Sequence, residues 1–269
     1  MNWIVPAGIT ACYGEEEGMT KIPVCLQMYT VRDDAQRDLV GTLAYVASLG
    51  YQGVELAGYA GKTAEEYKAL LDANNLRAIG AHVGVDVVTG KPDQAIAEAR
   101  LFGYDYVIVP WIGKPYTESL AGYAKLGAEL SAIAPVYADA GLTLCYHNHA
   151  FEFDLSEGGK TGLDVLFESA PSLQAELDTF WIKKGGQDIA DYLTRLSGRV
   201  PLVHLKDMDS DGSFAPVGTG TVDYPALFAA AEAAGTKFYM VEQDSCQAPL
   251  TPLESIKISI ENLKAWGKV

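Results

Sequence analysis

Basic residues are scarce in this sequence. Its 269 residues include 20 Lys and Arg against 35 Asp and Glu, which gives a formal net charge of −15 at pH 7. Proteins that bind nucleic acids hold the phosphates with clustered Lys and Arg, and the counterions released there supply most of the affinity. The acidic balance therefore predicts that no nucleic acid is a partner.

Long hydrophobic runs are absent too. No uncharged apolar stretch reaches the roughly 18 residues of a membrane-spanning helix, so we expect no membrane partner. The apolar stretch from Trp3 to Tyr13 has no Lys or Arg before it, and glutamates follow it at positions 15–17. A secretory signal has the opposite polarity. We therefore expect residues 1–21 to form an N-terminal arm.

Cysteine is rare and is not arranged for metal binding or disulfide exchange. The four cysteines, Cys12, Cys25, Cys145 and Cys246, show no CxxC spacing. Two of them, Cys25 and Cys145, lie within apolar runs, where a free thiol packs as a small hydrophobic side chain. This usage is typical of a reducing compartment, so we predict a cytoplasmic localisation.

The residues that are abundant alternate between two patterns. With 49% apolar and 20% charged residues, the composition is that of an ordinary globular protein. Eight short apolar or β-branched runs each predict a buried strand: Pro23–Met28, Gly53–Leu56, Ala78–Val83, Tyr106–Pro110, Thr143–His147, Gln174–Asp178, Leu202–Lys206 and Phe238–Glu242. Stretches between them have apolar residues at helical spacing and predict amphipathic helices, such as Leu39–Leu49, Ala64–Asn74, Asp93–Phe102, Leu120–Ala140 and Tyr224–Ala234.

This order of elements predicts the fold class. Glycines at positions 50, 103, 141 and 235 stand just before strands, where a helix commonly ends in a left-handed residue. Strands that alternate with helices form a parallel sheet, and eight such units close into a (β/α)8 barrel. An open, doubly wound sheet would carry a glycine-rich phosphate loop after its first strand, but residues 27–32 contain no glycine. We therefore predict an α/β protein whose residues 22–269 form a single TIM barrel.

Polar side chains concentrate at the carboxyl ends of the predicted strands. In a (β/α)8 barrel these ends form the functional face. The residues found there are Gln27, Tyr29, Glu55, His82, Pro110, Trp111, His147, His149, Glu176, Asp178, His204, Lys206, Glu242 and Gln243. Burying such groups without partners is costly, so we expect them to share a ligand, a metal or one another.

All four histidines of the chain lie at these strand ends: His82, His147, His149 and His204. On the predicted fifth to eighth strands, His147, Asp178, His204 and Glu242 provide one ligand each. A mixed set of imidazoles and carboxylates suits Mn²⁺, Co²⁺, Zn²⁺ or Fe²⁺ better than Ca²⁺. The sequence therefore predicts a divalent metal held by these four residues.

Five segments at the strand ends resemble a known family. In order, Tyr146–Phe153, Glu176–Thr179, Val203–Asp207, Val217–Tyr224 and Val241–Asp244 are similar to the xylose-isomerase-like sugar phosphate isomerase/epimerase superfamily. The similarity extends from Ile22 to about Trp266. The resemblance implies a divalent metal held by Glu, Asp, His and Glu from strands five to eight, with two glutamates exchanging protons with a sugar carbon. Asp178, His204 and Glu242 match this pattern residue by residue.

Strand five departs from the family pattern. Where many relatives read Glu-Asn-His, this chain reads His147-Asn148-His149, and the nearest acid is Glu152. If His147 binds the metal, His149 or Glu152 supplies the second acid or base while Glu242 ligates and assists the proton transfer. In the alternative, Glu152 folds back onto the metal and both histidines face the substrate. The sequence leaves both arrangements open.

Other strand-end groups are candidates for holding a substrate. Lys206 is suited to reach an oxyanion or a hydroxyl, and it is the next candidate for proton transfer. The indoles of Trp111 and Trp181 either stack on a sugar or plug the barrel mouth. Three further residues are assigned to the substrate site: Gln27, Glu55 and His82. For Glu55 an ion pair with Arg32 is the alternative.

The segment 218–224 raises the question of a phosphorylated substrate. Its backbone amides precede a helix and could cradle a phosphate. Capping of that helix by Thr221 or Asp223 explains the segment equally well. No Arg occurs in the seventh strand or in the loop that follows it, which weakens the case for a phosphate group.

Together with the resemblance, these residues predict an enzyme. We expect a metal-dependent sugar isomerase or epimerase that removes a proton beside the carbonyl of a carbohydrate or polyol, with the metal polarising that carbonyl. The alternative is a lyase or dehydratase acting on a keto-sugar or keto-inositol. Two other classes of protein are weighed as alternatives. A DNA-repair nuclease on the same barrel needs more histidines and a basic surface, which this sequence lacks. A non-catalytic sugar-binding barrel would hold less than one metal per chain, so a metal assay distinguishes it. We also expect a homo-oligomer, because the segment Tyr116–Ala140 is rich in Ala and Leu.

Overall fold

A closed ring of eight parallel strands forms the centre of the protein. The structure is a computed structural model and describes residues 21–269. The strands follow the order β1-β12-β9-β8-β5-β4-β3-β2, and β1 pairs with β12 to close the ring. Their bounds are β1 (Val24–Gln27), β2 (Gly53–Leu56), β3 (Arg77–His82), β4 (Tyr106–Val109), β5 (Thr143–His147), β8 (Gln174–Asp178), β9 (Leu202–Leu205) and β12 (Phe238–Val241). The predicted (β/α)8 TIM barrel is therefore confirmed.

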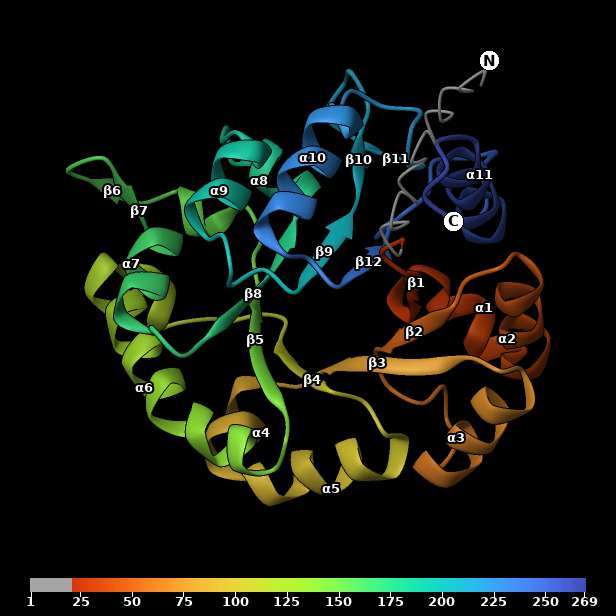
Figure 1. Cartoon of the computed structure of the whole chain (residues 1–269), viewed down its shortest axis with the longest axis horizontal. Coiled ribbons are helices and arrows are strands. Elements are labelled where there is room, and N and C mark those ends of the chain that lie inside the picture. The colour runs from red at the N-terminus through yellow and green to blue at the C-terminus, as the bar shows by residue number, and fades with distance from the viewer. Residues whose placement is uncertain (1–20) are drawn as a thin grey trace, which may run out of the picture.

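Helices surround this ring (Figure 1). They are α1 (Arg32–Arg37), α2 (Leu39–Ser48), α3 (Ala64–Ala73), α4 (Val85–Gly90), α5 (Pro92–Phe102), α6 (Leu120–Asp139), α7 (Gly162–Ser169), α8 (Thr179–Lys184), α9 (Ile189–Arg195), α10 (Tyr224–Ala234) and α11 (Pro252–Ala265). Three 3-10 turns, η1 (Met28–Val31), η2 (Tyr116–Glu118) and η3 (Phe151–Phe153), lie in the loops. Two hairpins also extend from loops: β6 (Ser156–Glu157) with β7 (Lys160–Thr161), and β10 (Asp207–Met208) with β11 (Phe214–Ala215).

Local sequence signals fix the ends of these helices. Thr63, Thr161 and Thr251 each form a capping box, in which the threonine and the acid three residues later satisfy each other's backbone N–H groups. The helices α5 and α10 end at Gly103 and Gly235, whose φ angles are 73° and 84°. Only glycine adopts this conformation without a steric cost. Both helices therefore end at the predicted glycine, and the next strand, β4 or β12, begins three residues later.

Inward-facing side chains fill the barrel in layers, because alternate residues of a strand face the same side. A buried apolar layer crosses the middle of the barrel and consists of Cys25, Ile79, Ile108, Cys145, Leu202 and Met240. Tyr106 and Phe238 pack against it from the amino ends of β4 and β12. The larger core lies between the outer faces of the strands and the helices. The middle layer separates the polar carboxyl end from the amino end.

Several other predictions can be compared with the structure. Cys25, Cys145 and Cys246 are free thiols, whereas Cys12 and the predicted arm lie in residues 1–20, outside the described part of the chain. No helix within residues 21–269 is long and apolar enough to cross a membrane. The cytoplasmic localisation and the homo-oligomer stay predictions.

Candidate metal centre and active site

Four predicted metal ligands meet at the carboxyl end of the barrel. His147, Asp178, His204 and Glu242, here called the upper set, offer ligand atoms within 4.8 Å of one another. His147 Nε2 lies 3.3 Å from Asp178 Oδ2, and His204 Nδ1 lies 2.9 Å from Glu242 Oε2. The parallel register of β8 and β9 sets Asp178 beside His204. Each of the four residues is at most 4% exposed, so the set is a buried cluster of imidazoles and carboxylates.

Lys206 lies against the carboxylates of the upper set. Its Nζ is 3.0 Å from Glu242 Oε2, 3.4 Å from Asp178 Oδ2 and 2.5 Å from Asp244 Oδ1. Burial opposes the ammonium charge, but these three carboxylates outweigh burial and raise the pKa of Lys206 above its ordinary value. Lys206 is therefore a buried cation and hydrogen-bond donor at the site.

A second group of ligand atoms, here called the lower set, shares His204 with the upper set. Its members are Glu55, His82, Glu176 and His204, and their ligand atoms also lie within 4.8 Å of one another. His82 Nε2 is 2.7 Å from Glu55 Oε1 and 3.1 Å from Glu176 Oε2. His204 Nε2 is 3.3 Å and 3.1 Å from the same two oxygens. The two ring nitrogens of His204 therefore face different sets.

Three residues that the sequence assigns to substrate binding contact one another at the lower set. The Gln27 side-chain amide donates a hydrogen bond to Glu55. Burial disfavours the ionised Glu55 carboxylate and alone would raise its pKa, but the neighbouring His82 and His204 hold the pKa of Glu55 well below its usual range. Glu55 in turn raises the pKa of His82 to about 10, again against the effect of burial. The alternative prediction of an ion pair between Glu55 and Arg32 is wrong, because the Arg32 guanidinium instead donates hydrogen bonds to the backbone carbonyls of Tyr29 and Asp244.

Glu176 is the ligand candidate that sequence reasoning missed. The sequence places it at a strand end and in the segment Glu176–Thr179 that resembles the family, without a role as a ligand. It precedes Asp178 by two residues on β8, so both side chains face the barrel interior. This spacing is the signal that could have identified Glu176 as a second inward-facing carboxylate.

His149 and Trp181 border the upper set. The His149 ring centre is 5.0 Å from that of His147 and 5.3 Å from that of Trp181, and Lys206 Nζ is 5.1 Å from the Trp181 ring centre. Burial and the neighbouring His147 lower the pKa of His149 to about 3, so this imidazole is neutral. Within residues 21–269, the buried His149 Nδ1 and Trp181 Nε1 have no hydrogen-bond partner. The hydrogen-bonding capacity of both atoms is therefore unmet within the protein.

Glu152 points away from the upper set. Its Oε1 accepts a hydrogen bond from the Tyr146 hydroxyl at 2.7 Å, and its Oε2 accepts one from the His149 backbone N–H at 2.9 Å. Tyr146 precedes His147 on β5, so its side chain leaves the opposite face of the strand. Burial raises the pKa of Glu152 to about 8. The arrangement in which Glu152 folds back onto the metal is not the one observed, and Glu152 instead fixes the loop after β5.

Trp111 lies exposed in the loop after β4. It follows β4 and is 59% exposed, and its indole packs over the backbone of Gly113. Of the two predicted aromatic contacts, only Trp181 borders the upper set. The stacking of Trp111 on a sugar stays a prediction.

The segment 218–224 is organised by an internal carboxylate. Asp207 accepts hydrogen bonds from the backbone N–H groups of Gly218, Gly220 and Val222 at 2.9 to 3.1 Å. These amides are the ones that a phosphate cradle would need, and Asp207 already occupies them. The capping explanation is confirmed, because Asp223 accepts a hydrogen bond from the backbone N–H of Ala226 at the start of α10.

The residues present fit a divalent transition metal. Imidazole and carboxylate ligands from separate strands form the donor set that Mn²⁺, Co²⁺, Zn²⁺ and Fe²⁺ accept. Within residues 21–269, three buried polar atoms of the two sets have no hydrogen-bond partner: His147 Nδ1, Glu55 Oε2 and Glu176 Oε1. Buried acids in such number are costly without a compensating cation. A divalent cation is therefore compatible with both the chemistry and the charge of the site.

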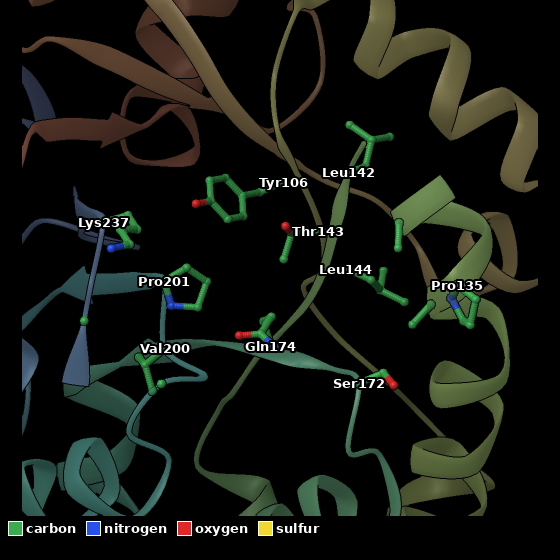
Figure 2. A pocket seen from close by; sticks show the side chains of 14 residues that line it. Tyr106, Pro135, Leu142, Thr143, Leu144, Ser172, Gln174, Val200, Pro201 and Lys237 are labelled. Carbon is green, nitrogen blue, oxygen red and sulfur yellow. The ribbon is translucent and has the colours of Figure 1, made fainter. Parts of the chain in front are cut away.

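A cavity of about 520 Å³ lies at the opposite end of the barrel (Figure 2). Tyr106, Thr143 and Gln174 begin strands β4, β5 and β8, and Pro201 and Lys237 precede β9 and β12. Among the described residues, no His, Asp or Glu lines this cavity. It therefore lacks groups for metal binding, and the candidate active site is at the carboxyl ends of the strands.

Comparison with known proteins agrees with this fold. The sequence profile of the Xylose isomerase-like TIM barrel family matches residues 43–266, and the chain belongs to this family. An inosose dehydratase from Geobacillus thermodenitrificans is 27% identical over an alignment of 216 positions, which covers 72% of this chain and 67% of that protein. The resemblance found in the sequence is therefore confirmed.

Solved structures with the same fold include two sugar enzymes. A sugar phosphate isomerase/epimerase from Parabacteroides distasonis superposes with a TM-score of 0.80 at 22% identity, covering 97% of this chain and 100% of that chain. A D-allulose 3-epimerase from Methylomonas sp., solved with D-allulose, gives a TM-score of 0.66 at 16% identity over 91% and 97% of the two chains. At these identities the likeness establishes the fold.

Proposed function

We propose that this protein is a metal-dependent enzyme that moves a proton beside the carbonyl of a carbohydrate or polyol, and so isomerises or epimerises it. The observation that carries this proposal is the convergence of the upper set, the Lys206 ammonium and the unpartnered His149 imidazole at one end of the barrel. Membership of the Xylose isomerase-like family supports it. So do the names of relatives, which include an epimerase and a dehydratase.

The upper set would hold the metal. His147 and His204 contribute imidazole nitrogens, and Asp178 and Glu242 contribute carboxylate oxygens. A divalent cation in such a site acts as a Lewis acid that polarises a carbonyl oxygen and makes the adjacent C–H more acidic.

The neighbouring side chains are assigned the proton transfer. Lys206 donates a hydrogen bond toward the oxygen that gains negative charge, which is stabilisation by a pre-oriented cation. His149 is neutral and has no protein partner at Nδ1, so it accepts the substrate proton there. Glu242 touches both His204 and Lys206 and assists the transfer.

The surroundings favour a substrate without phosphate. Trp181 borders the upper set, and an indole face stacks well against the C–H groups of a sugar. The amides of the segment 218–224 already bind the Asp207 carboxylate, so they offer no cradle to a phosphate. A neutral keto-sugar, polyol or keto-inositol fits these features.

Elimination of water is the second candidate reaction, and a specific observation favours it. His147 stands where many relatives have a glutamate, so the pair of glutamates used for two-sided proton exchange is incomplete. Loss of a β-hydroxyl needs only one base together with a donor to the leaving group. The inosose dehydratase relative, at 27% identity, also supports a dehydratase acting on a keto-inositol.

Proton NMR in D₂O tests both candidates at once. The Mn²⁺-loaded protein is incubated with a panel of keto-sugars and keto-inositols, and deuterium at the carbon beside the carbonyl is followed together with product formation. Exchange with an isomeric product supports the isomerase, and exchange with an unsaturated or diketo product supports the dehydratase. The matched control is Lys237→Ala at the opposite end of the barrel, which should exchange at the wild-type rate. Absence of exchange in every substrate would contradict the proposal.

A further inference from the structure

We infer that Glu152, together with Tyr146, positions the His149 imidazole beside the upper set. Glu152 points away from that set, so it acts through His149 and not on a substrate. This inference rests on the proposed function, which assigns the substrate proton to His149. The observation behind it is a fully buried carboxyl group that connects the outer face of β5 to the backbone of His149.

The parallel ladder of the barrel ends before it reaches His149. The strand β5 ends at His147, which is its last residue to pair with β8. At the next position the Asn148 side chain replaces the ladder, because its Oδ1 accepts a hydrogen bond from the Asp178 backbone N–H at 2.9 Å. Beyond these attachments, Glu152 Oε2 accepts a hydrogen bond from the His149 backbone N–H at 2.9 Å. Glu152 therefore continues the row of attachments past the end of the strand.

A short turn brings Glu152 back behind the strand. Glu152 is the middle residue of η3 (Phe151–Phe153), and its Oε1 accepts a hydrogen bond from the Tyr146 hydroxyl at 2.7 Å. Both side chains are fully buried. The Tyr146 ring packs edge-on against Phe167 of α7, with ring centres 6.5 Å apart, so the outer core holds the hydroxyl in place. A buried and fully satisfied contact of this kind specifies one geometry.

The same turn also contacts the His149 ring. Phe151 stacks on it with ring centres 5.5 Å apart and an interplanar angle of 11°. His147 and Trp181 border the ring on other sides. Because Phe151 and Glu152 are neighbours in η3, a shift of this turn would move the ring and the backbone of His149 together. A displacement of about 1 Å in a reacting group can slow a reaction about 10²-fold.

The competing explanation is that this contact only stabilises the loop. A buried tyrosine hydroxyl stabilises a fold wherever it finds an acceptor. The Tyr137 hydroxyl offers the same chemistry elsewhere, since it donates a hydrogen bond to the Val88 carbonyl at 2.9 Å and joins α6 to α4. A purely stabilising role predicts that Tyr146→Phe and Tyr137→Phe both lower the free energy of unfolding and leave His149 unchanged. A measurement at the His149 ring therefore separates the two explanations.

Nuclear magnetic resonance of the histidine rings is the test, on the full chain loaded with diamagnetic Zn²⁺. The chain has four histidines, so His149→Ala identifies the signals of His149. Glu152→Leu removes both hydrogen bonds, whereas the amide in Glu152→Gln can accept from the backbone N–H and donate to the Tyr146 oxygen. Tyr146→Phe removes one of the two and replaces Glu152→Leu if the latter does not fold. Tyr137→Phe is the matched control.

We expect the His149 ring protons of the wild type to be shifted upfield by the face of Phe151. They should move toward the positions of an unstacked ring in Glu152→Leu and Tyr146→Phe, and stay in place in Glu152→Gln and Tyr137→Phe. With a keto-sugar or keto-inositol that the Mn²⁺-loaded wild type exchanges, deuterium incorporation in Glu152→Leu should fall at least about tenfold. Its KM and metal content should stay unchanged.

Unchanged ring signals and an unchanged exchange rate in Glu152→Leu, with a lower free energy of unfolding, would overturn the positioning role. Failure of the proposed function gives a different result. If the wild type exchanges none of the substrates, or if His149→Ala exchanges at the wild-type rate, the assignment of the base is wrong. The ring signals still decide in that case whether Glu152 positions His149.

Discussion

The two ends of the barrel are built from the same strands and have opposite chemistry. At the carboxyl end, the upper and lower sets bury carboxylates, histidines and a lysine in contact with one another. At the amino end, the cavity of about 520 Å³ is lined by neutral side chains and by the exposed Lys237. The apolar middle layer separates them. The comparison teaches that buried charged groups, and not open volume, distinguish the candidate site of this barrel.

The largest effect is expected for His204→Ala. This change removes the ligand that the upper and lower sets share, so stoichiometric metal should be lost while the fold is kept. Elemental analysis of protein purified without chelator measures the effect. Lys237→Ala, at the other end, should retain all the metal. Full occupancy in His204→Ala would refute the assignment.

Metal removal should destabilise the protein substantially. A ligand that binds only the folded state at about 1,000 times its Kd stabilises by about 4 kcal/mol. For a chain of this size the Tm should then fall by roughly 10 °C on chelation. Differential scanning calorimetry with and without Mn²⁺ measures the shift. The same shift in His204→Ala would show that the stabilising metal lies elsewhere.

Loss of the proposed base should slow proton exchange without releasing metal. For His149→Ala we expect roughly a 10²-fold slower incorporation of solvent deuterium, which is typical for removal of a general base. Glu152→Gln should exchange nearly as fast as the wild type, because the Glu152 side chain contacts Tyr146 and the loop backbone. A decrease of less than about tenfold in His149→Ala would assign the role to another group, with Lys206 as the next candidate.

Glu152 should also make stability depend on pH. Folding raises the pKa of Glu152 from 4.5 to about 8, since the carboxyl group is buried. The folded state therefore holds this proton more tightly than the unfolded chain, and the contribution is full below about pH 4.5 and lost as the pH rises through 8. Glu152→Gln stays neutral and can keep both hydrogen bonds. Relative to the wild type, the free energy of unfolding of this variant should therefore rise by on the order of 4 kcal/mol between pH 5 and pH 9.

Chemical denaturation of both proteins at the two pH values measures this difference. Every other titrating group is the same in the two chains, so the difference reports Glu152 alone. An equal change of unfolding free energy with pH in both proteins would mean that Glu152 is ionised in the folded state.

The smallest effect is expected at the amino end. Lys237 is exposed and lines the cavity away from both sets, so Lys237→Ala should change the unfolding free energy by less than about 0.5 kcal/mol. Its exchange rate should equal that of the wild type. A strong loss of activity would mean that the amino end takes part in function, and the comparison of the two ends would fail.

Much of the fold was predictable because its signals are local. Buried strands such as Thr143–His147 are short apolar runs, and stops such as Gly103 and Gly235 need only a backbone with positive φ. Short helices gave weaker signals. The helix α8 (Thr179–Lys184) begins directly after β8, and the Asp178 side chain caps it. In the sequence Asp178 is recognisable as the end of an apolar strand, and its second role as the cap of a six-residue helix is not apparent.

The site was predictable in its residue types and not in its pairings. Strand parity alone brings His147, Asp178 and His204 to the barrel interior. The direction of Glu152 depends on Tyr146, whose hydroxyl meets it on the far side of the strand. The division of His204 between two sets depends on its ring orientation, which Glu55, 149 positions away, helps to set. Contacts of this kind depend on tertiary packing.

Anomalous diffraction from crystals grown with Mn²⁺ tests the central claim most directly. The upper set predicts a strong anomalous peak within bonding distance of His147 Nε2, Asp178 Oδ2 and His204 Nδ1. Glu242 Oε2 should complete the protein ligands. A peak at this position would locate the metal among the groups proposed to move the proton. The absence of a peak there, or a peak only at the amino end of the barrel, would contradict the account.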